Sequence, residues 1–178
     1  MYGLGVNKLG VTNTSHDILR LFANGEQGAW YDPSDLSSLF QNSDGTVAAV
    51  VGQPVGYVGD KSGNGNNAIQ ATSARRPVLR EADGLYYLEF DGSGGLQVAS
   101  LDLTATDELT HFTGHTKTTS TENAILLEHS SSAVSGNGTF AVSAPQNSTN
   151  HYLIAARGTV RSSDAVTSAT YAGAFTAV

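Results

Sequence analysis

Oxygen-bearing side chains gather at two glycine-rich turns, and their types and spacing could hold a metal ion. Residues 60–68 read Asp-Lys-Ser-Gly-Asn-Gly-Asn-Asn-Ala, and Asp91 opens a second such turn. Calcium prefers carboxylate and carbonyl oxygens, so a calcium site would take its ligands from Asp60, Asn64, Asn66 and Asp91. The EF-hand pattern fails because its twelfth position is Ala71 instead of glutamate. The competing interpretation, which we favour, is that these side chains bond the backbone amides of their own turns.

Paired carboxylates could also hydrolyse a sugar. Glu89 and Asp91 lie two residues apart on an expected strand, so they share one of its faces. Jelly-roll glucanases place a nucleophile and an acid with the pattern Glu-x-Asp-x-Glu, but the third position here is Ser93. Retaining hydrolysis would lack its acid, and a solvated strand edge explains the pair more simply. We therefore expect no enzyme activity and no catalytic residues.

Neither the histidines nor the glycines complete a cofactor motif. No zinc pattern such as His-Glu-x-x-His joins His16, His111, His115, His129 and His151. His111 and His115 share a face of an expected strand, where zinc would need a third ligand. The Gly-x-Gly-x-x-Ala pattern at 63–68 matches a dinucleotide fingerprint, which requires a helix after it, whereas the residues that follow are β-prone. We expect no cofactor other than the calcium considered above.

Flat aromatic side chains could stack on sugar rings, because such faces suit apolar partners of many kinds. The candidates are Trp30, Tyr31, Tyr57, Tyr86 and Tyr87. Packing in a core competes with this role and should prevail for most of them, Trp30 included. On the strand expected at 86–90, successive side chains alternate between two faces, which directs Tyr86, Leu88 and Phe90 inward.

The charge balance restricts the partners. The 178 residues carry 9 Lys and Arg against 16 Asp and Glu, a net charge of -7. The one close basic group is Arg75, Arg76 and Arg80, so phosphate backbones are repelled overall and we expect no nucleic-acid binding. No apolar run approaches the length of about 20 residues that crosses a bilayer, so we expect no membrane insertion. The chain has no cysteine, which excludes disulfides and thiolate metal sites.

From Thr46 onward, short β-prone runs alternate with turn signals such as Asp83-Gly84. No long helical pattern intervenes, which argues against a parallel α/β sheet. We therefore predict an all-β fold, an antiparallel two-sheet β-sandwich. Its strands are expected at 47–51, 55–58, 68–71, 77–79, 86–90, 96–99, 109–117, 124–129, 139–143, 152–157 and 166–175.

Two short helices are predicted before the sandwich. Ser15 can cap one that runs through Phe22 and stops at Gly25. Asp32 and Pro33 can start another, whose apolar face would carry Leu36, Leu39 and Phe40. Helices this short are stable only when they pack against other elements, so we expect both to lie on a sheet.

The domain prediction separates residues 1–26, an extended N-terminal arm with a short helix, from the sandwich at 27–178. Residues 1–14 can bury little apolar surface by themselves. We expect this arm to attach to another chain, with folding back onto its own domain as the alternative. The apolar run 170–178 has no polar tail behind it. We therefore expect the natural protein to continue beyond Val178, in which case the sandwich here is incomplete at its C-terminal end.

Two motifs resemble the paired signatures of laminin-G-like, concanavalin A-like jelly-roll domains. In that group a turn of the form Asp-x-Ser-Gly-Asn-Gly-Asn precedes a strand that ends in Phe-Asp-Gly. Residues 60–66 and 90–92 match the two signatures in that order. The resemblance implies a jelly-roll connection for the predicted sandwich, and many domains of the group bind calcium.

A narrower resemblance covers residues 22–117. Residues 28–41, with the run Trp-Tyr-Asp-Pro-Ser-Asp-Leu, and residues 51–56 and 76–79 look like bacteriophage and prophage virion or tail-associated proteins that carry such a domain. This resemblance implies a structural protein at the particle surface, of the fibre, spike or decoration type. Its partners would be other virion proteins through the arm, further copies of itself, and a host-surface glycan. The alternative is a free carbohydrate-binding module of the lectin type.

Overall fold

The computed structural model describes residues 18–99, 101–102, 109–116, 125–130 and 140–143, and the backbone of residues 151–156 and 165–170. The predictions for the N-terminal arm, for Ser15 and for the chain after Thr170 lie outside this part. The chain forms two compact units, Met1–Thr110 and His111–Val178. The boundary predicted after residue 26 stays a prediction. In the described ranges, no helix has the length and apolar character needed to cross a membrane.

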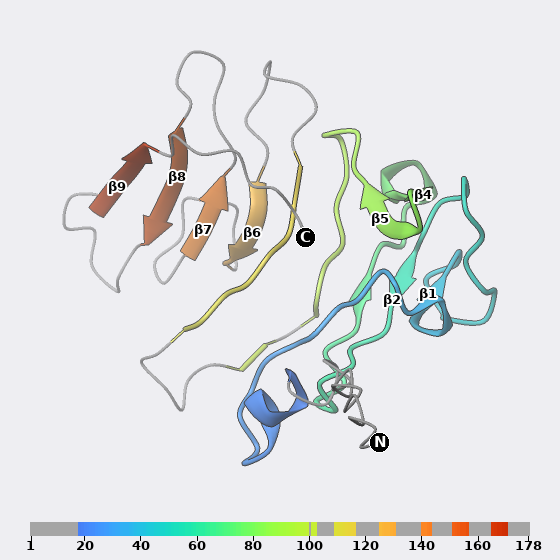
Figure 1. The fold of residues 1–178 in the computed structure, drawn as a ribbon, viewed down its shortest axis with the longest axis horizontal. Coiled ribbons are helices and arrows are strands. Elements are labelled where there is room, and N and C mark those ends of the chain that lie inside the picture. The colour runs from blue at the N-terminus through green and yellow to red at the C-terminus, as the bar shows by residue number, and fades with distance from the viewer. Residues whose placement is uncertain are drawn as a thin grey trace, which may run out of the picture. The chain divides into compact units, whose positions relative to one another are not determined.

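The first unit contains a three-stranded antiparallel sheet of very short strands (Figure 1). In spatial order these are β1 (Leu39–Phe40), β2 (Tyr57–Val58) and β3 (Ala68–Ile69). Isolated bridges extend the pairing, because Phe40 also pairs with Ala48 and Ile69 pairs with Gln97. The sheet is therefore continued by single contacts with the neighbouring loops.

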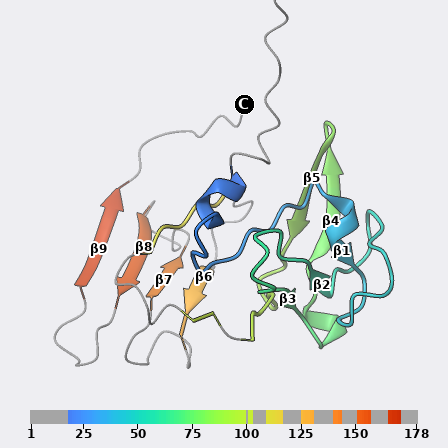
Figure 2. The same ribbon diagram turned by 90° about the horizontal axis from the view of Figure 1, so that it is seen from below.

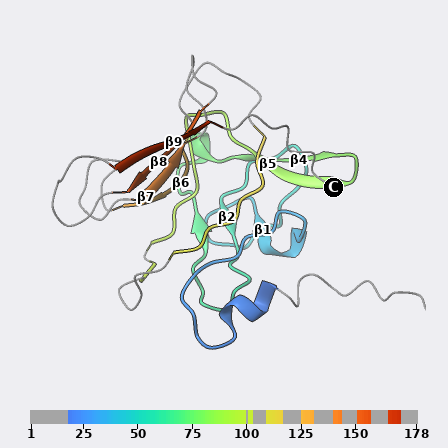
Figure 3. The same ribbon diagram turned by 60° about the vertical axis from the view of Figure 1, so that its left-hand side comes forward.

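A hairpin of β4 (Val78–Ala82) and β5 (Leu85–Glu89) forms the second sheet of this unit, and Figure 3 shows the two strands side by side. Asp83 and Gly84 join them with φ angles of 53° and 79°. Two-residue hairpin turns require positive φ at both positions, which explains the Asp-Gly pair. On its other edge β4 bonds the segment before β2, since the N–H of Gly52 donates to the Leu79 carbonyl at 2.8 Å.

The core of the first unit is small and aliphatic. Its buried members come from all four of β1 to β4 and from the segment before β2: Leu39, Val55, Val58, Ala68 and Leu79. Tyr86 and Leu88 of β5 pack against this cluster, as the alternation along the strand predicts. Phe90 is 50% exposed, so its predicted inward position is wrong. The strand ends at Glu89, and the alternation ends with it.

The second unit contains a four-stranded antiparallel sheet whose strands pair in chain order (Figure 2). They are β6 (Ile125–His129), β7 (Phe140–Ser143), β8 (His151–Ala156) and β9 (Ala165–Thr170). The register of β8 and β9 is regular over the whole of both strands, whereas β6 and β7 show an irregularity near Ile125. Ala141 on the inner strand β7 is buried.

The all-β prediction is confirmed in its coarse form. The described residues form strands in small antiparallel sheets, and their helical segments are short. Residues 18–19 are α-helical and lead into the 3-10 turn η1 (Arg20–Phe22), and two further 3-10 turns are η2 (Leu36–Ser38) and η3 (Ser73–Arg75). The first agrees with the predicted stop, because Gly25 has a φ of 84° and donates its N–H to the Phe22 carbonyl at 3.3 Å. Glycine adopts this left-handed conformation without steric cost.

The longer helix predicted from Asp32 onward is wrong. Asp32 accepts the backbone N–H of Ser34 at 3.0 Å and closes a separate turn, and η2 begins only after Asp35. Leu39 leaves the helical pattern because it is fully buried in β1, where it pairs with Val58. Pairing and burial in the sheet therefore override the local helix signals at this point.

Most predicted strands coincide with observed ones, but three do not. The strands expected at 47–51 and 96–99 are reduced to single bridges at Ala48 and Gln97. Residues 109–116 form no strand. The valines of 47–51 are exposed, so their β-branched side chains have no sheet face to pack on, and composition alone does not create a strand there.

Candidate functional site

Asp60 is the centre of the first glycine-rich turn. Its carboxylate Oδ1 accepts hydrogen bonds from the backbone N–H groups of Trp30 and Ser62, each at 2.9 Å. Its Oδ2 accepts the N–H of Asn66 at 2.9 Å and the hydroxyl of Ser62 at 2.7 Å. Four donors therefore occupy the carboxylate, which offers about four acceptor positions. One of them comes from a residue 30 positions earlier in the chain.

The asparagines of this turn bond the same earlier segment. The side-chain amides of Asn64 and Asn66 donate to the carbonyl of Gly28 at 3.1 and 2.7 Å. Asn64 also donates to the carbonyl of Glu26 at 3.0 Å, and the Tyr31 hydroxyl donates to the carbonyl of Asn66. Because the turn joins β2 to β3, these bonds fasten residues 26–31 to the first sheet.

The electrostatics of this turn favour an ionised Asp60 held by N–H groups. Burial by itself raises the pKa of Asp60, but the hydrogen bonds from Trp30, Ser62 and Asn66 outweigh it and keep the pKa below the usual value. A calcium ion would have to displace these donors from the carboxylate. The geometry therefore fits the self-bonded turn for Asp60, and the calcium assignment stays a prediction.

Asp91 lies in a different turn. Its Oδ1 accepts the N–H and the hydroxyl of Ser93 at 2.8 and 2.7 Å, and these bonds lower its pKa. The structure thus brings Asp60, Asn64 and Asn66 together and gives Asp91 a separate set of bonds. Within the described ranges, no three His, Cys, Asp or Glu side chains are grouped so that they could hold a metal ion.

Lys61 is a residue of this region that the sequence analysis missed. Its ammonium nitrogen lies 3.1 Å from Asp32 Oδ2, 2.8 Å from Asp35 Oδ2 and 4.6 Å from the centre of the Trp30 ring. Burial lowers the pKa of Lys61, but the two carboxylates outweigh this and raise it. The signal in the sequence is a lysine inside the turn motif and two aspartates after the tryptophan. A separation of 29 residues between Lys61 and Asp32 hides their contact.

Of the five aromatic candidates, all of which are described, Tyr87 alone has an exposed side chain, at 45%. Tyr31 and Tyr86 pack against the core, and Tyr57 meets the ring of Phe40 edge-on at 5.5 Å. Trp30 is half-buried outside the core cluster, with Lys61 over its ring, so its predicted core position is wrong. Tyr87 is therefore the candidate whose ring is accessible to a sugar.

Tyr87 belongs to the outward side of the β4–β5 hairpin, which we call the hairpin face and define as Arg80, Ala82, Leu85, Tyr87 and Glu89. Tyr87 pairs with Arg80 across the hairpin, and directly opposed residues point to the same side of a sheet. Leu85 is 68% exposed. The Nε of Arg80 lies 2.6 Å from Oε2 of Glu89. The face therefore combines exposed apolar side chains with a charged, hydrogen-bonding pair.

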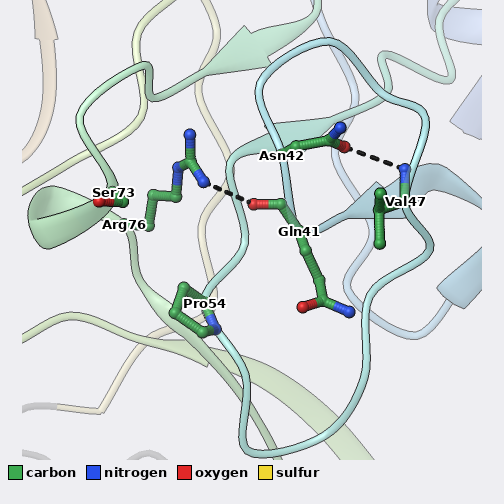
Figure 4. Close-up of a pocket in the computed structure, with 6 residues that line it drawn as sticks. All are labelled: Gln41, Asn42, Val47, Pro54, Ser73 and Arg76. Carbon is green, nitrogen blue, oxygen red and sulfur yellow. Dashed lines mark hydrogen bonds between the residues drawn. The ribbon is translucent and has the colours of Figure 1, made fainter.

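A second feature is an open hollow of about 250 Å³ between the loop after β1 and the segment around η3 (Figure 4). Its lining residues are Gln41, Asn42, Val47, Pro54, Ser73 and Arg76. We call it the Arg76 hollow. Val47 and Pro54 give the hollow an apolar side, and Ser73 and Arg76 give it polar groups, whereas the side-chain amides of Gln41 and Asn42 bond Ala48 and Thr46.

Backbone carbonyl groups hold the Arg76 side chain in place. Its Nε donates to Gln70 at 2.9 Å, Nη1 to Gln41 at 3.0 Å and Nη2 to Ala71 at 3.0 Å. Gly56 permits this approach, because a Cβ atom there would lie 2.7 Å from Arg76 Nε and 2.8 Å from the Gln41 carbonyl oxygen. The guanidinium plane is therefore fixed at the wall of the hollow.

Two histidines in the second unit have lowered pKa values. Partial desolvation lowers the pKa of both His111 and His129, and the charge of His129 lowers that of His111 further. The face that His111 was predicted to share with His115 is not formed, since residues 109–116 are not a strand. His16 and the side chain of His151 lie outside the described residues.

No protein-family model, no curated protein and no solved structure matches this chain. The resemblance to laminin-G-like domains of phage virion proteins therefore stays a prediction.

Proposed function

We propose that this chain is a non-enzymatic structural and host-contact protein of a bacteriophage particle, built as a laminin-G-like jelly roll of two stacked sheets. In this proposal the hairpin face contacts a glycan on the host surface. The N-terminal arm attaches the chain to other virion proteins, and several copies form a symmetric assembly. The observation that carries the proposal is the exposed Tyr87 and Leu85 beside the Arg80–Glu89 pair.

The hairpin face has the chemistry that a sugar ring requires. The C–H side of a ring can pack on the exposed face of Tyr87, because aromatic rings accept apolar partners on their faces. The sugar hydroxyl groups can exchange hydrogen bonds with Arg80 and Glu89, and bonds to charged groups are the stronger ones. Contiguous exposed apolar residues on a protein surface commonly mark contact sites. A strand face of this kind supports binding rather than turnover in a deep cleft.

The state of the two candidate catalytic carboxylates supports a non-enzymatic role. Glu89 is paired with Arg80 at 2.6 Å. The pKa of Asp91 is lowered by its bonds to Ser93, whereas a general acid in a glycosidase needs a raised pKa. Neither carboxylate thus has the surroundings of a catalytic acid.

Purified particles test the first part of the proposal. Particles of the phage or prophage that encodes this chain should contain it in many copies, and quantitative mass spectrometry of the particle proteins would measure this. A particle preparation that is infective and contains no copy of the chain would overturn the assignment to a virion.

A matched pair of variants tests the hairpin face. Tyr87→Ala should weaken binding to host-surface polysaccharide by about tenfold, since stacking on an aromatic face is worth about 1 kcal/mol or more. Val51→Ala is the control, because Val51 is 46% exposed on a loop outside the hairpin face, and it should leave binding unchanged. Equal binding by both variants in a biolayer interferometry assay would refute the role of the hairpin face.

The alternative function is that of a free lectin module, which would bind its glycan with the same exposed Tyr87. The two candidates differ in assembly. A lectin module would bind glycan as a monomer, whereas a virion subunit should form a symmetric oligomer. The mass of the chain in light scattering separates them, and a monomer that binds glycan and is missing from particles would favour the lectin.

A further inference from the structure

We propose that the Arg76 hollow binds the carboxylate of an acidic sugar, such as a uronate unit of a host-surface glycan. The choice of a glycan as the source of the carboxylate rests on the proposed function. The binding chemistry itself rests on the guanidinium of Arg76 and on the residues that line the hollow.

The charge of Arg76 is the first argument. The ion pairs found in the described part of the chain involve Lys61 and Arg80, and none includes Arg76. Arg76 is half-buried and faces three backbone carbonyl oxygens, which satisfy hydrogen bonds but leave its positive charge uncompensated. A partly desolvated cation is stabilised further by an anion at hydrogen-bonding distance.

The geometry of the guanidinium is the second argument. An arginine side chain has five N–H donors, and three of them are used by the bonds to Gln70, Gln41 and Ala71. Those bonds hold the group rigidly, so a ligand would not have to order it. Preorganised donors bind with a smaller loss of conformational entropy than mobile ones.

The lining of the hollow favours a sugar over a bare anion. Val47 and Pro54 offer an apolar side to the ring carbons, and Ser73 offers a hydroxyl group to a ring hydroxyl. The side-chain amides of Gln41 and Asn42 are bonded within their own loop, to Ala48 and Thr46. Pockets for drug-sized ligands measure about 300–1,000 Å³, so a hollow of about 250 Å³ fits a smaller group such as one sugar unit.

Local charge also favours an acidic ligand despite the net charge of -7. Arg75 and Arg76 are adjacent in the sequence, and Arg80 follows on β4. The one acidic residue of the loop 41–47, Asp44, accepts the N–H and the hydroxyl of Thr46 at 3.1 and 2.8 Å. These bonds from neutral groups leave its negative charge in place, and Arg80 is paired with Glu89. The local balance is therefore two arginines, Arg75 and Arg76, against one carboxylate.

The test uses a variant pair that leaves the bonds of Arg76 intact, since Arg76→Ala would remove three backbone contacts and could unfold the first unit. Ser73→Glu places a carboxylate at the hollow, whereas Ala74→Glu adds the same charge one residue later, outside the lining. Amide signals of the full chain are followed by NMR during titration with glucuronate, with glucose and with acetate. We expect glucuronate to shift the signals of residues 41–42 and 73–76 and glucose to leave them in place.

Ser73→Glu should weaken glucuronate binding by about tenfold or more, because like charges repel at close range. Ala74→Glu should change it by less than about twofold, because an exposed charge is screened by solvent and salt. Equal effects of the two variants, or equal shifts with glucose, would overturn the inference. Acetate that binds as tightly as glucuronate would overturn its sugar component.

The outcome is separable from that of the proposed function. If glucuronate does not bind at the hollow while Tyr87→Ala still weakens glycan binding, the inference fails and the proposed function stands. If particles lack the chain but glucuronate shifts the NMR signals of residues 73–76, the virion assignment fails and the inference about the Arg76 hollow stands.

Discussion

The two units of this chain reach antiparallel β-structure in different ways. In the first unit, β1, β2 and β3 have two residues each, and so short a ladder supplies few backbone bonds. Polar side chains of the turn at 60–66 supply bonds to a segment that lies 30 to 38 residues earlier. In the second unit, β6 to β9 have four to six residues and pair with their neighbours in the chain.

The two units therefore differ in their sensitivity to single substitutions. The first unit depends on a few buried aliphatic side chains and on Asp60, whose carboxylate accepts four hydrogen bonds. Single substitutions there should therefore lower its stability strongly. The second depends on many equivalent backbone bonds, which no single side chain controls. The predictions below test this contrast, beginning with the largest effect.

Leu79→Ala should destabilise the first unit by about 3 kcal/mol, because truncation of a buried leucine leaves a cavity. Leu79 is fully buried, whereas Leu85 in the same hairpin is 68% exposed. Leu85→Ala is therefore the matched control and should cost far less. Hydrogen exchange of individual amides should show faster exchange in β1, β2 and β4 and unchanged exchange in β6 to β9. An equal acceleration in both units would contradict the contrast.

Asp60→Asn should destabilise the first unit by about 2 kcal/mol, since hydrogen bonds to a charged acceptor contribute about 1.5–3 kcal/mol. The amide keeps the shape of the carboxylate but turns an N–H group toward the donors that now surround Asp60. Asp91→Asn is the control, since Asp91 accepts its bonds from Ser93 within the same turn, and the loss of stability should be smaller. Urea unfolding followed by Trp30 fluorescence would measure both.

Acid should affect the second unit before the first. The lowered pKa of His129 means that the unfolded chain binds a proton more tightly than the folded one. The second unit therefore keeps this stability above about pH 6.5, the pKa of histidine in the unfolded chain, and loses it as the pH falls below that value. The lowered pKa of Asp60 likewise makes the first unit less stable in acid, but only as the pH falls below about 3.9, the pKa of aspartate in the unfolded chain.

NMR signals of β6 and β7 should therefore change at a higher pH than the fluorescence of Trp30, the chain's single tryptophan. His129→Gln removes one of the two histidines with a lowered pKa in the second unit and also the charge that lowers the pKa of His111, so it should shift the change toward more acidic pH. Coincident transitions of the two units in the unmodified chain would contradict this prediction.

Glu89→Gln should have the smallest effect, within about 0.5 kcal/mol, because exposed ion pairs contribute little. Arg80 and Glu89 have side chains that are 45% and 51% exposed. A thermal unfolding scan with the double variant Arg80→Gln and Glu89→Gln would isolate the pair energy. A loss above about 1 kcal/mol would show that the Arg80–Glu89 pair stabilises the hairpin.

The parts of the fold that were predictable are those with short-range causes. Asp83 and Gly84 determine a two-residue turn through their positive φ angles, so the β4–β5 hairpin follows from local sequence. The stop at Gly25 is of the same kind. The helix expected after Asp32 failed, because Leu39 gains more from burial between strands than the local signals offer to a helix.

The candidate site was predictable to a smaller extent. The turn at 60–66 was found from its residue types, and its self-bonded state follows from the short reach of aspartate side chains. Its bonds to Gly28 and Trp30 depend on chain segments that are distant in sequence. The approach of Arg76 to the Gln41 carbonyl across Gly56 likewise involves three separate segments.

The β-rich class of this chain, its turns and its negative charge can be read from the sequence, because each of these depends on residue type and near neighbours. The tertiary structure decided which aromatic ring is exposed, which carboxylate is saturated and which arginine borders a hollow. Those properties depend on the groups that surround a side chain after folding. No local pattern encodes burial or hydrogen bonding between distant segments. These are what join Asp60 to a segment far away in the sequence and leave the Tyr87 side chain exposed.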